Sequence, residues 1–183
     1  IDFTSQIYGS ECEDLVRKTW HAVFVVSGSG IQLRDGTIVF PVVARKDYET
    51  RESGYPVHVI FTKDLGRTWQ FGAQSMTGGD ETKVVELNNG SLLASIRNIS
   101  RRIFVVSHDK GNHWEYPYKR EDMVDPGCNG DIKRYTSKLD GYDKDRLIHT
   151  NQYHVKSRRN LTIKISYDEG NTWKYTKSLD PQL

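Results

Sequence analysis

The chain has 183 residues, with 26 lysines and arginines against 24 aspartates and glutamates, so its formal charge at pH 7 is only +2. This balance does not indicate a polyanionic partner, and we expect no nucleic-acid binding. No apolar run approaches the roughly 18 residues of a membrane helix, so the sequence predicts no integral membrane segment. The length suits one domain, yet the chain begins at Ile1 without an initiator methionine or a signal peptide, which suggests a piece of a longer protein.

The chain contains two cysteines, Cys12 and Cys128. Two are too few for a disulfide framework, and neither has a neighbouring Cys or His at zinc-binding spacing. One bridge and two free thiols are both open. The sequence therefore predicts no metal and no other cofactor.

An eight-residue motif, Ser/Thr-x-Asp-x-Gly-x-x-Trp, recurs three times, at residues 62–69, 107–114 and 166–173. Its aspartates follow one another at intervals of 45 and 59 residues. These intervals approach the roughly 40 to 50 residues of one blade of a β-propeller, with the excess falling in loops. The motif therefore predicts a repeat architecture.

Each position of this Asp motif has a physical role in a turn. The Asp carboxylate accepts hydrogen bonds from the N–H groups after it, the Gly allows a positive φ, and the Trp covers the turn with an apolar face. We interpret the motif as a structural turn away from the chemistry. Its residues are Asp64, Gly66, Trp69, Asp109, Gly111, Trp114, Asp168, Gly170 and Trp173.

In chain order, each repeat carries a hairpin signal and then a strand signal before its Asp motif. Asp-Gly or Asn-Gly between apolar runs is a strong hairpin signal. The hairpins are predicted at 31–40, at 84–93 and, more loosely, from 132–135 to 146–148. The following strands, rich in β-branched and aromatic residues, are predicted at 57–61, 102–106 and 161–165.

Each repeat therefore has four predicted strands, a to d, and no window of helical periodicity competes with them. We expect an all-β fold with three propeller blades at about 22–72, 80–117 and 129–177. Propellers typically close with 4 to 8 blades, so the chain is expected to be about half of such a ring.

Blade topology also predicts where a site would lie. The b–c loops and the d–a crossings share one face, and the Asp motifs lie on the other. Basic residues recur in the b–c segments: Arg97 after the second hairpin, and Arg158 with Arg159 in the third loop. The loop of the first blade adds further basic side chains, Arg45, Lys46 and Arg51. Convergent guanidinium groups indicate an anionic small ligand.

With these residues the chain resembles the catalytic propeller of the sialidase (neuraminidase) family, whose Asp boxes match the Asp motif. The resemblance implies a six-bladed β-propeller, of which this chain would hold about three blades. The segment from Asp80 to Arg97 resembles the stretch that holds a catalytic glutamate and the second arginine of a carboxylate-binding triad. That resemblance implies Glu81 as the catalytic base and Arg97 as a substrate-binding residue. Arg158-Arg159-Asn160-Leu161-Thr162 is similar to the family's Arg-x-Asn-Leu-Thr and implies that Arg158, rather than Arg159, also binds substrate.

The resemblance implies an exo-α-sialidase, a glycoside hydrolase that acts on sialylated glycoproteins, glycolipids or oligosaccharides. Secretion or display at the cell surface is a family-based expectation. The nucleophilic tyrosine, the first arginine and the acid aspartate would lie outside this chain, so these residues alone are expected to be inactive. Tyr167 and Tyr175 fall on the wrong face to be the nucleophile.

Two alternatives remain. A trans-sialidase would need an acceptor site, for which Tyr48 or Tyr55 would be a platform, and a catalytically silent sialic-acid-binding propeller would keep only the Asp motifs. A further match, Cys128-x-Gly130, resembles a stretch lining the family's pocket, but Asp131 stands where the family has serine.

Overall fold

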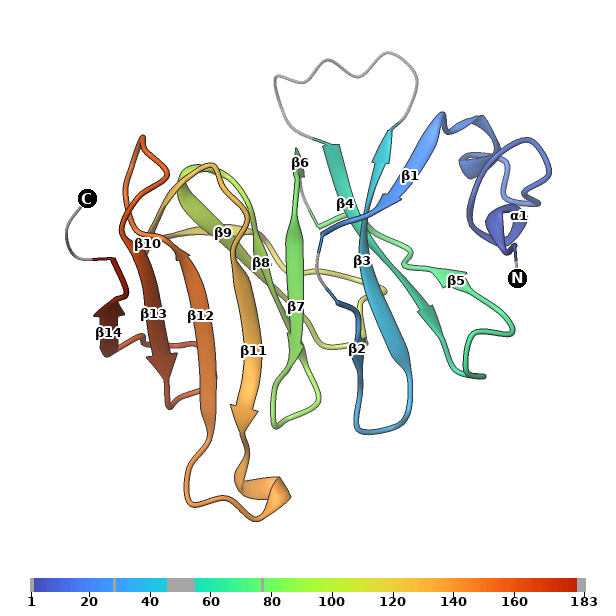
Figure 1. Ribbon diagram of the computed structural model, residues 1–183. Coiled ribbons are helices and arrows are strands. Elements are labelled where there is room, and N and C mark those ends of the chain that lie inside the picture. The colour runs from blue at the N-terminus through green and yellow to red at the C-terminus, as the bar shows by residue number, and fades with distance from the viewer. Residues whose placement is uncertain (1, 28, 46–54, 77, 181–183) are drawn as a thin grey trace.

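The computed structural model describes residues 2–27, 29–45, 55–76 and 78–180, which form three antiparallel β-sheets standing side by side (Figure 1). The fold is all-β, as the repeat predicts. Strand β7 of the second sheet packs against β3 of the first sheet and β11 of the third, so the middle sheet is covered on both faces.

The first sheet has the strand order β1-β3-β4-β5, with β2 also pairing with β3 and β6 with β4. Its strands are β1 (Ala22–Val25), β2 (Ile31–Gln32), β3 (Ile38–Arg45), β4 (Tyr55–Thr62), β5 (Gln70–Phe71) and β6 (Gly78–Gly79). The predicted strand 57–61 lies within β4. Lys46, Tyr48 and Arg51 fall outside the described residues.

The second sheet has the order β10-β9-β8-β7, and the third has the order β11-β12-β13-β14. The second consists of β7 (Thr82–Glu86), β8 (Leu92–Ile96), β9 (Ile99–Ser107) and β10 (Tyr118–Pro126). The third consists of β11 (Asp131–Thr136), β12 (Arg146–Gln152), β13 (Leu161–Ser166) and β14 (Tyr175–Ser178). Each contains the hairpin and the strand expected of it.

The second sheet extends beyond the expected blade boundary at 117. Its outer strand β10 continues to Pro126, and its register against β9 shifts between Lys119 and Val124. Its residues from Lys119 to Asp122 are all charged, and most of them are exposed, so this part of the strand lacks the apolar alternation that identifies strands in a sequence. A bulged, charged strand ending in proline is typical of a sheet edge.

The inner strand of the first sheet is broken into β1 and β2, which pair with different parts of β3. The break faces Pro41 in β3, whose carbonyl accepts the Val26 N–H at 3.4 Å. A residue in an antiparallel strand presents its N–H and C=O to the same neighbour. The nitrogen of Pro41, which has no hydrogen to donate, therefore faces the broken strand. The β3–β4 ladder loses no hydrogen bond to this proline.

The three Asp motifs follow β4, β9 and β13 and form the same turn each time. In the first, Asp64 Oδ1 accepts the Thr62 hydroxyl at 2.8 Å and the Thr68 N–H at 2.9 Å. The Thr62 hydroxyl oxygen accepts the Gly66 N–H at 2.9 Å. The corresponding bonds of the other two motifs lie between 2.8 and 2.9 Å. The turn-locking role predicted for the motif is thus present three times.

Two apolar cores fill the spaces between the sheets. Trp114 packs in the core between the first and second sheets, and Trp173 packs in the core between the second and third. Trp69 packs instead in a core that includes Ile7 and Phe3 from the start of the chain. Each Asp-motif tryptophan therefore contributes to the core on the N-terminal side of its own sheet.

The first residues of the chain cover the outer face of the first sheet. A one-turn helix, α1 (Thr4–Ile7), places Phe3 against Trp69 with ring centroids 5.0 Å apart. The Gln6 side-chain oxygen also accepts the Trp69 N–H at 2.6 Å. Elsewhere in the described ranges, single 3-10 turns lie at Arg17–Thr19 and Lys138–Asp140. The sequence did not predict that the N-terminal segment covers the first sheet.

Candidate functional site

The candidate site is built where β7 begins and β8 ends. The Arg97 N–H donates to the Glu81 carbonyl at 3.0 Å, which extends the β7–β8 ladder by one pair beyond Thr82 and Ile96. The Arg97 guanidinium then donates through Nη1 to Glu81 Oε2 at 2.6 Å. The ladder thus holds the two predicted residues as cross-strand neighbours in direct contact.

Charge and partial exposure distinguish this pair from an ordinary surface ion pair. About a quarter of each side chain remains exposed, 27% for Arg97 and 25% for Glu81. Asp80 lies 3.5 Å from the same Nη1. Burial alone would lower the pKa of Arg97, but its hydrogen bond to Glu81 and the charges of Glu81 and Asp80 outweigh burial and raise it. Arg97 therefore stays cationic while remaining accessible to an anion.

Arg158 lies in the β12–β13 loop, at the same end of the sheets. The loop is closed by the Tyr153 N–H donating to the Asn160 carbonyl at 2.9 Å, and Asn160 has a positive φ of 59°. Arg159 is held within the loop by His154 Nε2 at 2.8 Å from its Nη2. Arg158 is exposed, and within the described residues it has no hydrogen bond or ion pair. The structure therefore leaves it separate from the Glu81–Arg97 pair.

The crossing from β10 to β11, residues 126–130, is the next segment at this end. Cys128 is a buried free thiol, as is Cys12, so the open question of a bridge is answered by two free cysteines. Asp131 opens β11 and pairs with Thr150. Lys83 of β7 donates to the Asn129 side-chain oxygen at 3.1 Å. Burial lowers the pKa of Lys83, and the negative charge of Asp131 opposes part of that shift.

A fully buried ion pair, which the sequence did not predict, lies beneath the Glu81–Arg97 pair. Arg102 Nη1 and Asp125 Oδ2 are 3.0 Å apart, and neither side chain is exposed. Arg102 also donates to the Ser95 hydroxyl at 2.8 Å. A signal was available, because Arg102 shares a strand face with buried Phe104 two residues later. A charge on the inward face of a strand indicates a buried partner.

The Asp motifs lie at the opposite end of the sheets, as predicted, because they follow β4, β9 and β13 (Figure 1). Tyr167, inside the third motif, lies there as well, with the Arg146 guanidinium 5.8 Å from its ring centre. Tyr55 begins β4 and is paired in register with Gly79, partly buried against the first core.

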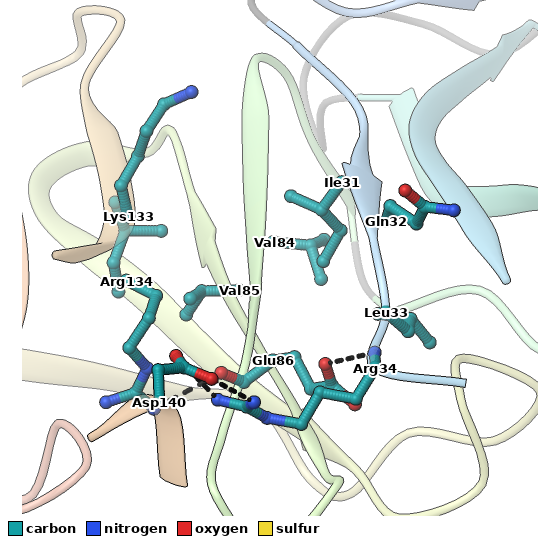
Figure 2. A pocket seen from close by; sticks show the side chains of 11 residues that line it. Ile31, Gln32, Leu33, Arg34, Val84, Val85, Glu86, Lys133, Arg134 and Asp140 are labelled. Atoms are coloured by element: carbon teal, nitrogen blue, oxygen red, sulfur yellow. Dashed lines mark hydrogen bonds and ion pairs between the residues drawn. The ribbon is translucent and has the colours of Figure 1, made fainter. Parts of the chain in front are cut away.

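A hollow of about 400 Å³ opens between the innermost strands β2, β7 and β11. Figure 2 shows Arg34 reaching across it to Asp140, with Nη1 and Oδ1 2.6 Å apart. Glu86 accepts the Arg34 N–H at 2.9 Å, and Arg134 is paired with Glu169. Arg34 thus bonds to both Glu86 and Asp140, and Lys133 Nζ donates to the Ser29 hydroxyl at 2.8 Å. The hollow lies toward the motif end and is distinct from the predicted site.

Among residues 2–27, 29–45, 55–76 and 78–180, no three His, Cys, Asp or Glu side chains gather closely enough to hold a metal ion. Over the same described ranges, no helix is long and apolar enough to cross a membrane.

Comparison with known proteins gives a consistent result. The family described as "BNR repeat-like domain" matches residues 8–183. A sialidase of Micromonospora viridifaciens is 31% identical over 167 residues, which cover 88% of this chain and 26% of the relative. A sialidase of Bacteroides fragilis is 29% identical over 164 residues, covering 88% of this chain and 29% of the relative. The chain thus spans less than a third of these relatives.

Among solved structures, the Hadza microbial sialidase Hz136 superposes with a TM-score of 0.74 at 29% identity. The match covers 89% of this chain and 32% of that one. Three packed antiparallel sheets, each with an Asp-motif turn before its outer strand, define a class of protein, the bladed β-propellers. Within that class the chain belongs to the BNR repeat-like domain family, and it is similar to a part of each of these sialidases.

Proposed function

We propose that this chain supplies part of the catalytic site of an exo-α-sialidase, which removes terminal sialic acids from glycoconjugates. The observation that carries the proposal is the direct contact between Glu81 and Arg97, 2.6 Å apart at the end of the sheets away from the Asp motifs. An acid and a permanent cation, both partly exposed and fixed by one strand ladder, suit a substrate with a carboxylate beside its reacting carbon.

The chemistry of sialic acid explains why these residue types are useful. Its anomeric carbon carries a carboxylate, so a neutral tyrosine is a better nucleophile there than a carboxylate, and sialidases are known to use one. A tyrosine with an ordinary pKa near 10 needs a base to remove its proton. In our proposal Glu81 is that base, for a tyrosine outside this chain, and Arg97 binds the substrate carboxylate.

Arg158 is proposed as a second carboxylate-binding residue. Arg159 is occupied by His154 within its own loop, whereas Arg158 is exposed and unpaired among the described side chains. A free guanidinium can form a bidentate pair with an incoming carboxylate without first breaking another contact. This difference favours Arg158 over its neighbour as the ligand-binding residue.

The proposed partners follow from this activity. Substrates would be sialylated glycoproteins, glycolipids or oligosaccharides, and further blades would complete the ring around the site. A sialidase that acts on glycans outside the cell would be secreted or held at the cell surface.

The proposal is tested by assaying the complete gene product with a fluorogenic α-sialoside. We expect turnover in the wild type and a kcat reduced by about 100-fold or more in Glu81→Gln, since the base is lost while Arg97 remains. Glu115→Gln, at the motif end, is the matched control and should keep the wild-type kcat. Binding of free sialic acid with no turnover in the wild type would instead identify a silent binding propeller.

Two further measurements define the reaction. Product analysis with lactose as acceptor separates hydrolysis, which we expect, from sialyl transfer. The 183-residue chain assayed beside the complete gene product should show no turnover, because the proposed nucleophile is not among its residues. Turnover by the chain alone would mean that the nucleophile and the acid lie within it.

A further inference from the structure

The buried Arg102–Asp125 pair connects three segments of main chain that lead to the candidate site. Four of the five N–H donors of Arg102 are used: one on the Ser95 hydroxyl, one on the Ser95 carbonyl at 3.2 Å, one on Asp125 and one on the Cys128 carbonyl at 3.1 Å. Ser95 lies two residues before Arg97 in β8. The fork of Arg102 therefore fixes the main chain that presents Arg97.

Asp125 fixes the crossing 126–130 from the other side. Its Oδ1 accepts the N–H groups of Gly127 and Cys128, both at 2.8 Å. Gly130 then passes so close to Arg102 that a Cβ there would lie 2.9 Å from Nη1. A single carboxylate and a single guanidinium thus determine the path of the whole crossing.

The third segment is β12 of the next sheet. Asn151 donates from Nδ2 to Asp125 Oδ2 at 3.1 Å and to the Val124 carbonyl at 2.8 Å. Asn151 is almost fully buried and stands directly before Gln152, where β12 ends and the loop containing Arg158 begins. The same ion pair therefore links the strand that carries Arg97 to the strand that leads to Arg158.

Stability alone is a poor explanation for this arrangement. Removing two charges from water costs free energy that their attraction often fails to recover, and apolar replacements of similar size are frequently as stable. The pair also lies at the site end rather than in the middle of the core. Its position and its hydrogen bonds suit a role in fixing the main chain around the candidate site.

We propose that Arg102 and Asp125 are positioning residues, which hold Arg97, the crossing 126–130 and the strand leading to Arg158 in one fixed arrangement for binding an anionic substrate. Neither side chain would touch the substrate, because both are fully buried. The proposal rests on the proposed function for its effect on catalysis, but its effect on the crossing is independent of it.

The decisive variant is the double replacement Arg102→Met with Asp125→Leu, which removes the pair without leaving an unpaired buried charge. Arg120 and Asp122 provide the matched control. They form an Arg–Asp pair in the same strand, 2.6 Å apart, and Arg120 also crosses to the third sheet, donating to the Gly170 carbonyl at 3.0 Å. That contact lies at the motif end. Arg120→Met with Asp122→Leu therefore alters the same two sheets away from the site.

The first readout is hydrogen exchange in the complete gene product. Amides of residues 127–131 should exchange about 10-fold faster in the Arg102/Asp125 variant and at the wild-type rate in the Arg120/Asp122 variant. The second is kcat/KM with an α-sialoside. It should fall by about 10- to 100-fold in the first variant and by less than about twofold in the second, since small misplacements at a site have effects of this size.

Arg102→Lys is the milder test if the double variant fails to fold, because it keeps the charge and loses the fork. It should give the same faster exchange in 127–131 and a lower kcat/KM with an unfolding temperature close to the wild type. Unchanged exchange in 127–131, or equal losses of kcat/KM in the site-end and motif-end variants, would overturn the proposal. A wild-type protein without sialidase turnover would reject the proposed function alone, and the exchange result would still decide the positioning role.

Discussion

Gly170 of the third Asp motif lies against Leu93 of the second sheet, so closely that a Cβ on Gly170 would be 2.7 Å from Leu93 Cδ2. Gly111 of the second motif meets Val59 of the first sheet in the same way, at 2.6 Å from Cγ2. Both glycines also have positive φ angles, 87° and 94°. In the second and third motifs the glycine therefore serves both the turn and the packing against the preceding sheet.

Gly170→Ala should destabilise the protein by about 2 to 4 kcal/mol, through the left-handed backbone and the overpacking against Leu93 together. Gly90→Ala is the control, because Gly90 has a φ of 84° with no atom within 4 Å of its added Cβ. It should cost only about 1 to 2 kcal/mol. Urea unfolding of both variants measures the difference, and equal losses would show that contact with Leu93 is unimportant.

The Asp motifs should make the protein sensitive to acid. Hydrogen bonds from the Thr68 N–H and hydroxyl, and from Thr62, lower the pKa of Asp64 from its ordinary 3.8 to about 2. A carboxyl with a lowered folded-state pKa contributes stability above the unfolded value and loses it as pH falls through the folded value. We expect the urea midpoint to fall between about pH 4 and pH 2, and to fall less steeply in Asp64→Asn than in the control Asp180→Asn.

Arg158→Ala in the complete gene product should weaken binding of a sialic-acid analogue by about 2 kcal/mol or more, because a charge-assisted partner of the ligand carboxylate is removed. Arg159→Ala, its matched neighbour, should have a much smaller effect. Isothermal titration of both variants is the measurement. Greater sensitivity at Arg159 would contradict the assignment of the loop.

Lys164 should also make stability rise with pH, but in the alkaline range rather than in acid. It is buried, donates to the Asp122 carbonyl, and lies with Nζ 4.0 Å from the Tyr153 ring centre. Burial lowers the pKa of Lys164 from 10.5 to about 8, so the unfolded chain binds its proton more readily. Stability from this group therefore rises between about pH 8 and pH 10.5. Lys164→Met should remove that rise, and the exposed Lys177→Met should keep it.

Local sequence signals predicted the turns and most strands because their causes are local. Asp64, Thr62 and Gly66 interact within one turn, so their spacing alone specifies the hydrogen bonds. The fourth strand of the second sheet, Tyr118–Pro126, was harder to find. It is an edge strand whose first five residues show no buried apolar face, so its sequence lacks the alternation that identifies strands.

The same distinction applies to the site. Glu81 and Arg97 belong to one hairpin, so topology predicts that they share an end of the sheet, and the structure adds their contact. Arg102 and Asp125 lie on neighbouring strands of the second sheet, and Asn151 bonds to Asp125 from the third sheet. No spacing in the sequence encodes that meeting. The catalytic and binding roles of Glu81, Arg97 and Arg158 remain predictions.

The second and third sheets are fastened to each other at both ends. Arg120 of β10 donates to the Gly170 carbonyl in the turn of the third Asp motif, and Arg102 of β9 is joined through Asp125 to Asn151 at the other end. Contacts at two separated ends oppose relative rotation of the two sheets more than a contact at one end would. We therefore expect the separation between Arg97 and the loop of Arg158 to change little when a ligand binds.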